Sequence, residues 1–320
     1  MRPTFLPNGM VSKTSSSHKT ATLTSVDCPQ GTVPIRRYKK EDLIRIKSFS
    51  DSRVSNLHLM SNENPRQYLA ILRSTKLEPQ RGIRATMSLN NPHPVDNTQA
   101  SMAEMWVQSN VGDQMNGLQA GWIVSPQLNG DDHTHLFTLT TTNSYKTSCF
   151  NTLCGSFIQT DPSTPVDTEL SPISVFEGQQ YVIDLEIIQD NVTLDWWLVL
   201  NGNIYVGYFP ADIFTQLTGG GSYIAWGGLT RSQVGRLSPP MGTGYDGVGS
   251  YNFKTLGYFY NLKLVDASNN YIDPNRHHLK TYADSHCYAI SYLGKYKDTG
   301  HTLFYGGKDY EIVDPPCSFP

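Results

Sequence analysis

Apolar and polar side chains alternate in one short segment after another from about residue 67 to residue 306, and this period of two residues constrains the fold most strongly. Within residues 179–190, the odd-numbered side chains from Tyr181 to Ile187 are apolar, and Asp184 and Glu186 alternate with them. Successive side chains of a β-strand point to opposite faces, so the two sets lie on opposite faces. The repeated pattern predicts a chain built mainly of strands.

The alternation recurs in a second long run, over residues 255–267. The side chains expected to share one face of this strand are Tyr258, Tyr260, Leu262 and Leu264. An Asn-Gly-Asn turn at residues 201–203 predicts a hairpin within residues 196–210, because these residues accept the backbone of a tight turn.

The remaining strands are expected to be short, with few helices among them. Strands are expected over residues 67–74, 83–90, 102–109, 117–125, 134–142, 155–160, 223–229, 286–293 and 302–306. Short helices are expected over residues 40–47 and 211–217. A dozen or so short strands predict an all-β fold class with two packed antiparallel sheets, a β-sandwich.

Charge divides the chain into an N-terminal segment, residues 1–62, and a body, residues 63–320. The segment carries a net charge of +6 and the body −9. A basic arm can bind nucleic acid or fold back onto an acidic body, and no nucleic-acid motif accompanies the basic residues, so docking on the body is favoured. We expect residues 36–40 to meet carboxylates, and acid to loosen that contact.

Residues 48–66 are polar and without sustained periodicity, which is typical of an exposed linker that proteases cut. The N-terminal segment is therefore predicted to be a short, removable pro-segment. No apolar run approaches the 18 residues of a membrane-spanning helix, so neither a membrane nor a nucleic acid is expected as a partner.

The five cysteines favour an oxidising compartment. Two local pairs predict two disulfides: Cys149 with Cys154, and Cys287 with Cys317. Cys28 has no expected partner within this sequence. Asn191 begins a glycosylation sequon, which agrees with secretion. No signal peptide begins the chain, so we expect a leader and further pro-segment upstream.

Familiar catalytic and cofactor motifs are absent from the sequence: it has neither a phosphate-binding loop nor a nucleophile elbow. His133 and His135 could share a strand face and hold a metal, but a solvated strand end beside Asp131 and Asp132 explains them better. We therefore expect no cofactor and no metal site.

Three clusters of glycine and aromatic residues, at 118–122, 207–210 and 226–228, are the strongest local signals. Glycine within a strand indicates a bulge or the close approach of another backbone or a ligand. A neighbouring tryptophan could then line a ligand site or simply pack in the core of a curved sheet, and the clusters alone leave both readings open.

Together these segments resemble the neprosin family, glutamic endopeptidases abundant in plants. In the N-terminal segment the resemblance rests on residues 28–37 and 40–43, similar to the end of the family's activation peptide. In the body the matching segments, in family order, are Met105–Val107, Gln119–Trp122, Tyr145 with Cys149 and Cys154, Trp196–Trp197, Gly207–Pro210, Trp226–Gly228, Ser238–Gly242 and Phe304–Gly307. The resemblance implies a secreted plant zymogen whose residues 1–62 are a truncated activation peptide and linker, and whose residues 63–320 form a neprosin-type β-sandwich.

This sequence departs from the family at the two positions that carry its chemistry. Active members have a glutamate in each of the segments that here contain Gln119 and Leu229, and those two carboxyl groups activate water for attack on a peptide carbonyl. Glutamine can orient water, and another glutamic-peptidase family pairs Gln with Glu, but glutamine cannot exchange a proton. Leucine can do neither, so the family's two-glutamate mechanism cannot operate with these residues.

We therefore expect a secreted, non-catalytic relative of the proline-directed glutamic endopeptidases. Its partners would be extended proline-containing peptides, bound in a retained cleft, and its own pro-segment. The side chains expected to line the cleft are Trp122, Tyr145, Trp197, Tyr208, Trp226, Gly227 and Gly228.

Two alternatives remain open. The first is an active endopeptidase with displaced carboxylates, and the available acids are Glu104, Asp131, Asp132, Asp184 and Glu186, although outward strand positions and loop ends explain them. The second is a carbohydrate-binding sandwich in which Trp122, Trp197 and Tyr208 stack on sugar rings. A carboxylate beside the family positions would favour the first, and a flat row of exposed aromatic rings the second.

Overall fold

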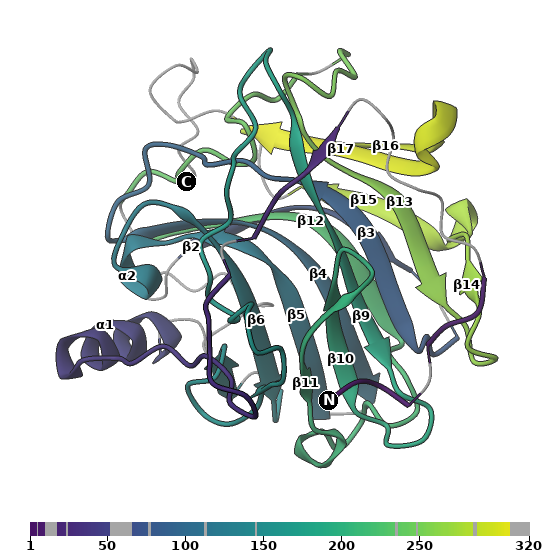
Figure 1. Ribbon diagram of the computed structural model, residues 1–320. Helices are drawn as coiled ribbons and strands as arrows, with labels where there is room; N and C mark the ends of the chain where they lie inside the picture. Colours follow the sequence, from purple (N-terminus) through teal and green to yellow (C-terminus); the bar gives the residue numbers. More distant parts are fainter. Residues whose placement is uncertain are drawn as a thin grey trace.

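The computed structural model confirms the predicted all-β class: two mainly antiparallel sheets pack face to face (Figure 1). It describes residues 1–4, 6–9, 18–23, 25–51, 66–75, 78–111, 114–144, 146–233, 236–247, 249–283 and 287–307.

The first sheet has seven strands within the described residues, in the order β15-β2-β12-β4-β5-β6-β7. Its strands are β2 (Arg66–Ser74), β4 (Gln99–Val111), β5 (Gln114–Val124), β6 (Thr134–Thr142), β7 (Thr147–Phe150), β12 (Tyr223–Ser232) and β15 (Leu279–Ala283). All its neighbouring strands run antiparallel, with β4 between β12 and β5.

The second sheet has ten strands among the described residues, eight of them in the order β16-β17-β13-β3-β9-β10-β11-β8. These strands are β3 (Gly82–Ser88), β8 (Ile158–Gln159), β9 (Tyr181–Gln189), β10 (Trp196–Leu200), β11 (Ile204–Phe209), β13 (Gly257–Val265), β16 (Tyr288–Lys295) and β17 (His301–Gly307). The short β14 (Tyr271–Ile272) pairs with β13, and β1 (Lys19–Thr20) runs parallel to β9.

Between the sheets lies a shared apolar core, which the alternation in the sequence specifies. From β9 the core receives Ile183, Leu185 and Ile187, as predicted, and from β4 it receives Ala103 and Met105. Because side chains alternate, the even-numbered side chains of β4 point away from the core, to the outer face of the seven-stranded sheet.

The predicted alternation fails in β13. Leu262 and Leu264 enter the inter-sheet core, but Tyr258 and Tyr260 pack in a separate cluster on the opposite face. The pairing of β13 with β3 shifts between Tyr260 and Lys263, where Asn261 has a φ of 52°. A bulge of this kind adds a residue to one strand, so every side chain beyond it changes face.

Helices are few and short in the described chain. The longest is α1 (Lys40–Asp51), which contains the expected helix 40–47 and lies beside α2 (Pro126–Asn129) (Figure 1). The helix expected over residues 211–217 is only one 3₁₀ turn, η1 (Ala211–Ile213), because Phe214 returns to extended backbone and is buried. Two further 3₁₀ turns are η2 (Arg276–His278) and η3 (Lys297–Thr299). No helix of the described chain is long and apolar enough to cross a lipid bilayer.

Two other sequence expectations concern local structure. The hairpin turn at residues 201–203 joins β10 to β11, and both Asn201 and Gly202 have positive φ, as tight hairpin turns require. The strand expected over residues 155–160 is reduced to the two residues of β8.

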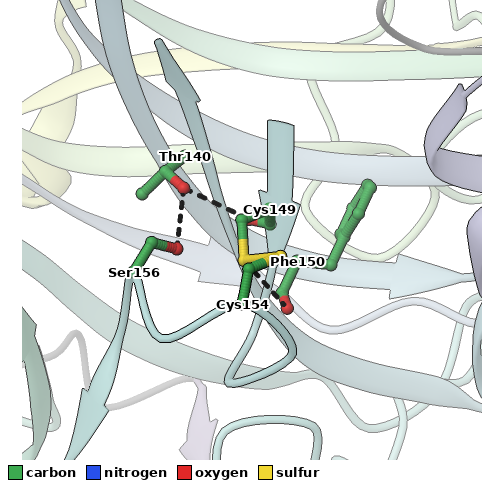
Figure 2. The surroundings of a disulfide bond; sticks show 5 residues. All are labelled: Thr140, Cys149, Phe150, Cys154 and Ser156. Atoms are coloured by element: carbon green, nitrogen blue, oxygen red, sulfur yellow. Dashed lines mark hydrogen bonds between the residues drawn. A yellow bond between two sulfur atoms is a disulfide. The ribbon is translucent and has the colours of Figure 1, made fainter. Parts of the chain in front are cut away.

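The predicted bridge between Cys149 and Cys154 is present, with 5.8 Å between the Cα atoms (Figure 2). It links β7 to the turn that follows it. The Thr140 hydroxyl on the adjacent strand β6 donates to Cys149 O and lies 2.8 Å from the Ser156 hydroxyl. Cys287 is also disulfide-bonded. Its predicted partner, Cys317, lies outside the described residues, so that pairing remains a prediction.

Candidate functional site

Gln119 and Leu229 lie on one face of the molecule, the outer face of the seven-stranded sheet. Gln119 belongs to β5, where it alternates with residues of the inter-sheet core, and Leu229 belongs to β12 and packs in a cluster separate from that core. The strand between them, β4, pairs Trp106 with Gln119 and Met102 with Leu229. The fold thus brings together the two positions that the sequence analysis singled out, separated by one strand and four residues of register.

Glu104 occupies the position on β4 midway between these two registers. It follows Met102 and precedes Trp106 on the same outer face, and it pairs with Gly121 on β5 and Gly227 on β12. Its side chain is fully buried, as are those of Gln119 and Leu229. Gln119 and Leu229 are therefore its diagonal neighbours on the two adjacent strands, a relation in which Cα atoms lie about 7–8 Å apart.

The two glycines beside Glu104 are required by close contact between backbones. A Cβ atom on Gly121 would lie 1.9 Å from Ala103 O, and one on Gly227 would lie 2.2 Å from Ala70 O. Gly227 also has a φ of 151°, which side-chain-bearing residues rarely adopt. As a result, no side chain stands directly opposite Glu104 on either neighbouring strand.

An apolar cluster surrounds Glu104 and Gln119 on the outer face and includes part of the N-terminal segment. Its buried members are Ile46, Phe49, Ile71, Ala100, Met102, Trp106, Ile123, Leu128, Phe137, Leu139, Phe150, Ala225 and Leu229. Ile46 and Phe49 come from α1, so the helix packs on the outer face that carries Gln119 and Leu229. The Phe49 ring lies 5.2 Å from the Phe150 ring of β7 and 4.3 Å from the Arg231 guanidinium of β12.

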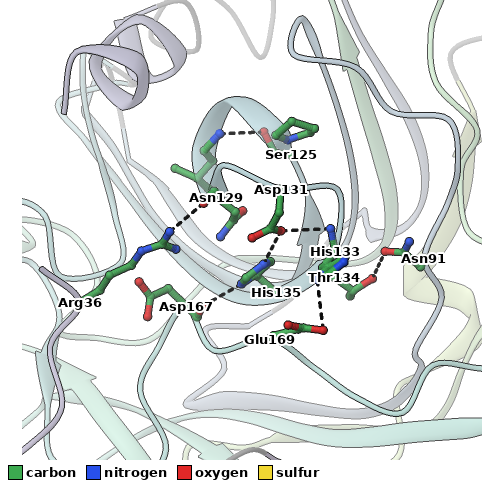
Figure 3. A network of polar contacts seen from close by, with 12 residues as sticks. Arg36, Asn91, Ser125, Asn129, Asp131, His133, Thr134, His135, Asp167 and Glu169 are labelled. Atoms are coloured by element: carbon green, nitrogen blue, oxygen red, sulfur yellow. Dashed lines mark hydrogen bonds and ion pairs between the residues drawn. The ribbon is translucent and has the colours of Figure 1, made fainter. Parts of the chain in front are cut away.

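Arginines hold the N-terminal segment through main-chain oxygens. Arg231 Nη1 donates to Phe49 O at 2.9 Å. In the opposite direction, Arg36 Nη2 donates to Asn129 O at 2.8 Å, at the end of α2 (Figure 3). Arg45 Nη1 likewise donates to Pro126 O at 2.7 Å. Phe49 O and Asn129 O lie in the last turns of α1 and α2, where carbonyl oxygens have no partner within the helix, so cationic donors satisfy them. Pro126 O begins α2 and also accepts a hydrogen bond from Gly130 N at 3.0 Å.

A carboxylate of the body also contacts the N-terminal segment, through a neutral tyrosine within the basic residues 36–40. The Tyr38 hydroxyl donates to Asp167 Oδ2 at 3.0 Å. Burial raises the pKa of Asp167, and the hydrogen bond from Tyr38 and the charge of Arg36 act in the opposite direction. Burial and the nearby Asp167 carboxylate raise the pKa of Tyr38, so its hydroxyl remains a donor.

His133 and His135, near this contact, make polar contacts at the start of β6. The ring nitrogens of His135 lie 2.9 Å from Asp167 O and 2.8 Å from Asp131 Oδ1, and exposed His133 lies 3.3 Å from Glu169 (Figure 3). Among the described residues, no group of three or more His, Cys, Asp or Glu side chains could hold a metal ion.

The described aromatic residues expected to line a cleft do not gather around Gln119, so the expectation is wrong for these four rings. Trp122 and Trp226 lie in the inter-sheet core because they alternate with the outward-facing residues of their strands. Trp197 and Tyr208 pack together on the outer face of the other sheet. Gly227 borders Glu104, whereas Gly228 faces the core against Met241 and Tyr305. Tyr145 lies outside the described residues.

These positions disfavour the carbohydrate-binding alternative for two of its three rings, whereas Tyr208 is partly exposed. Stacking on a sugar needs an exposed ring, but Trp122 is fully buried and Trp197 is 3% exposed. The exposed sequon residue Asn191, in the turn between β9 and β10, is accessible for modification, and its glycosylation remains a prediction.

Glu104 is explained from the sequence as an ordinary outward strand residue, and its place between Gln119 and Leu229 is missed. The signal was present: Glu104 is two residues from Trp106, which pairs with Gln119, so strand alternation puts all three on one face. The strand order, with β4 between β5 and β12, could not be predicted from the sequence.

Similarity to known proteins is found both among solved structures and among family profiles. Among solved structures, the chain is similar to the crystal structure of Scytalido-glutamic peptidase with a peptide-based transition-state analog. The TM-score is 0.38 at 10% identity, over 76% of this chain and 98% of that one. The family profile described as Neprosin matches residues 97–308, which include Glu104, Gln119 and Leu229. Since the match covers well over half of its length, the chain belongs to the neprosin family.

Proposed function

We propose that this protein binds an extended peptide on the outer face of its seven-stranded sheet, and that it lacks the two-glutamate hydrolysis of active neprosins. One observation carries the proposal: this face already holds a polypeptide segment. Phe49 of α1 packs in the apolar cluster and its carbonyl oxygen accepts a hydrogen bond from Arg231. Apolar side chains and main-chain oxygens are common to all peptides, so a face that recognises both can accept another peptide.

The chemistry of the two family positions supports the second half of the proposal. Neither the amide of Gln119 nor the hydrocarbon of Leu229 can take up and return a proton, and losing one acid–base group costs about 10²–10⁴-fold in rate. In the same proposal the protein is secreted, and cutting between α1 and β2, within residues 52–65, frees α1 to leave the sheet. Proline-containing peptides are favoured ligands because their extended form is already restricted before binding.

Peptide binding can be tested with a specific protease site placed within residues 52–65, so that the chain folds intact and is then cut. A fluorescent proline-rich peptide should bind the cut protein at least tenfold more tightly than the uncut protein, measured by anisotropy. An excess of unlabelled peptide 36–51 should displace it.

The matched variants are Leu229→Glu and Leu237→Glu. The first places a carboxylate in the apolar cluster and should weaken binding, and the second, at a 37% exposed leucine, should leave it unchanged. Equal binding by cut and uncut protein, or no binding by either, would show that the face is not a peptide site.

A further inference from the structure

Aromatic side chains gather on the outer face of the ten-stranded sheet, away from the proposed peptide site. The group includes Phe253, Tyr258, Tyr260, Tyr296 and Phe304. The bulge of β13 at Asn261 places Tyr258 and Tyr260 on this face, although Leu262 and Leu264 of the same strand enter the inter-sheet core. Bulges re-aim side chains and are common beside functional sites. The backbone of β13 therefore presents aromatic rings at a surface that a simple alternation would not give them.

Three of these rings enclose His18, a side chain of the N-terminal segment. The His18 ring centre lies 5.0 Å from that of Phe253, 5.3 Å from that of Tyr258 and 5.5 Å from that of Tyr260. The Phe253 ring stands nearly perpendicular to the two tyrosine rings, with interplanar angles of 83° and 86°. Rings that surround one group from perpendicular directions form an aromatic cage, the name used below for Phe253, Tyr258 and Tyr260.

Ring contacts, rather than hydrogen bonds, hold His18 in the aromatic cage. His18 is only 9% exposed, and its Nδ1 has no hydrogen-bond partner among the described residues. A charged imidazole has two N–H donors that require acceptors, so burial at this place lowers the pKa of His18. A cation without N–H groups would not leave a donor unsatisfied there.

The charge around the aromatic cage also suits a cation. The negative faces of aromatic rings attract a cation that lies within about 6 Å of the ring centre. The Asp298 carboxylate, on the exposed turn η3, favours the charged form of His18 and would favour another cation in the same way. The nearby Lys297 ammonium lies 4.8 Å from the ring of Tyr296, which is not one of the three cage rings.

We infer that the aromatic cage is a binding site for a quaternary ammonium group, such as that of choline, and that His18 occupies it until such a ligand displaces the ring. The trimethylammonium group is close to an imidazole ring in size, is permanently charged and has no N–H donor. This inference goes beyond peptide binding and does not depend on it, because the cage lies on the other sheet.

The attachment of the chain beside His18 allows its ring to leave the cage. The next two residues form the short strand β1, whose side chains are exposed. Lys19 N donates to Gln180 O at 3.1 Å, and Ala21 N donates to Val182 O at 2.9 Å. Both of these hydrogen bonds lie on the C-terminal side of His18. The ring can therefore rotate outward while β1 stays paired with β9.

The test uses the full chain with His18→Ala, which removes the ring from the cage and leaves β1 in place. Choline should bind this variant at least tenfold more tightly than it binds the original protein, measured by isothermal titration calorimetry at pH 7. The matched ligand is the neutral carbon analogue of choline, in which a tert-butyl group replaces the trimethylammonium group. It has the same shape without the charge, so it should bind His18→Ala at least tenfold more weakly than choline does.

Further substitutions in the His18→Ala protein identify the groups that recognise the charge. Phe253→Leu should weaken choline binding at least tenfold and binding of the neutral analogue less than threefold. Phe176→Leu, at a 54% exposed phenylalanine outside the cage, should change neither affinity. Asp298→Asn changes an exposed carboxylate and should weaken choline binding about threefold while the neutral analogue binds as before.

The source of the ligand is tested with free phosphocholine and with phosphatidylcholine vesicles. Binding of phosphocholine without vesicles assigns a soluble ligand, and vesicle binding that Phe253→Leu abolishes assigns a lipid headgroup. Urea denaturation checks that each variant is folded, and Asp298→Asn is also measured in the original protein, where folding does not depend on His18→Ala. Equal affinities for choline and its neutral analogue, an unchanged affinity in Phe253→Leu, or no choline binding by the folded proteins would overturn the inference. None of these results bears on the peptide site.

Discussion

The guanidinium of Arg231 lies 4.3 Å from the centre of the Phe49 ring and donates a hydrogen bond to the carbonyl oxygen of the same residue. One buried side chain of β12 thus binds both the ring and the main chain of α1. Hydrogen bonds from charged donors and desolvated cation–ring contacts each contribute about 1–3 kcal/mol.

Arg231→Met keeps the apolar stem and removes both contacts, so the N-terminal segment should leave the cut protein more easily. We expect the dissociation constant between the labelled N-terminal segment and the cut body to rise about 10–100-fold, measured by binding of the segment to immobilised body. Arg276→Met, at an exposed arginine, is the matched control. Identical dissociation constants for both variants would mean that Arg231 does not hold α1.

His18 should make the attachment of the N-terminal segment sensitive to acid. Its ring lies 5.0 Å from Phe253, 5.3 Å from Tyr258 and 5.5 Å from Tyr260, and burial lowers its pKa although Asp298 opposes the shift. The folded protein therefore favours neutral His18. This contribution is complete above the ordinary pKa of 6.5 and is lost as the pH falls through the lowered value.

His18→Phe keeps an aromatic ring and removes the proton-binding group. The variant should gain unfolding free energy relative to the original protein as the pH falls from 7 to 4, measured by urea denaturation at each pH. Parallel pH dependences would show that His18 stays buried when it is charged.

In folding, Asp167 acts with the sign opposite to that of His18. Its pKa is raised by burial, so the folded protein holds a proton on this carboxyl group more tightly than the unfolded chain does. Its contribution is present below the ordinary pKa of 3.8 and is lost as the pH rises through the raised value. The expectation that acid loosens the segment stays a prediction, because the Tyr38 hydroxyl and the Arg36 charge, both from the segment, lower the pKa of Asp167. Asp167→Asn should weaken the response of segment release to pH between 4 and 6.

Arg84 neutralises two buried carboxylates on the outer face of the ten-stranded sheet. It donates to Asp184 from Nε at 2.9 Å, and its Nη1 lies 3.4 Å from Glu186, which also accepts a hydrogen bond from the Tyr271 hydroxyl. Burial raises the pKa of both carboxyl groups, and Arg84 opposes that shift. Stability from such groups is complete below their ordinary pKa and declines as the pH rises through the raised values.

Arg84→Met should raise both pKa values further and leave two uncompensated charges at neutral pH. The loss of unfolding free energy should be about 3–5 kcal/mol at pH 7 and clearly smaller at pH 4, measured by urea denaturation. Adding Asp184→Asn to the variant should recover part of the loss at pH 7. A loss independent of pH would assign the effect to packing alone.

The sequence predicted the sandwich because the period of two residues is a local signal. Ile183, Leu185 and Ile187 face the core as that period requires. Strand order is not local, and only the placement of β4 between β5 and β12 shows that Glu104 joins Gln119 and Leu229. The glycine–tryptophan clusters were ambiguous for a similar reason: the requirement for Gly121 comes from the backbone of another strand, and Trp122 beside it fills the core.

Asn261 is where the local signal failed, and it can be tested directly. Its φ of 52° interrupts β13 and turns Tyr258 and Tyr260 outward, where both contact the ring of His18. Asparagine tolerates this backbone, glycine adopts it freely, and a β-branched residue is strained there by about 1–3 kcal/mol. Asn261→Val should therefore lower the unfolding free energy by that amount, whereas Asn261→Gly should lower it by less than about 1 kcal/mol. Because the bulge positions the rings around His18, Asn261→Val should also reduce the acid sensitivity of the N-terminal segment. If Asn261→Val proved as stable as Asn261→Gly in urea, the strand would have removed the bulge by shifting register, and amide hydrogen exchange along β13 would detect the shift.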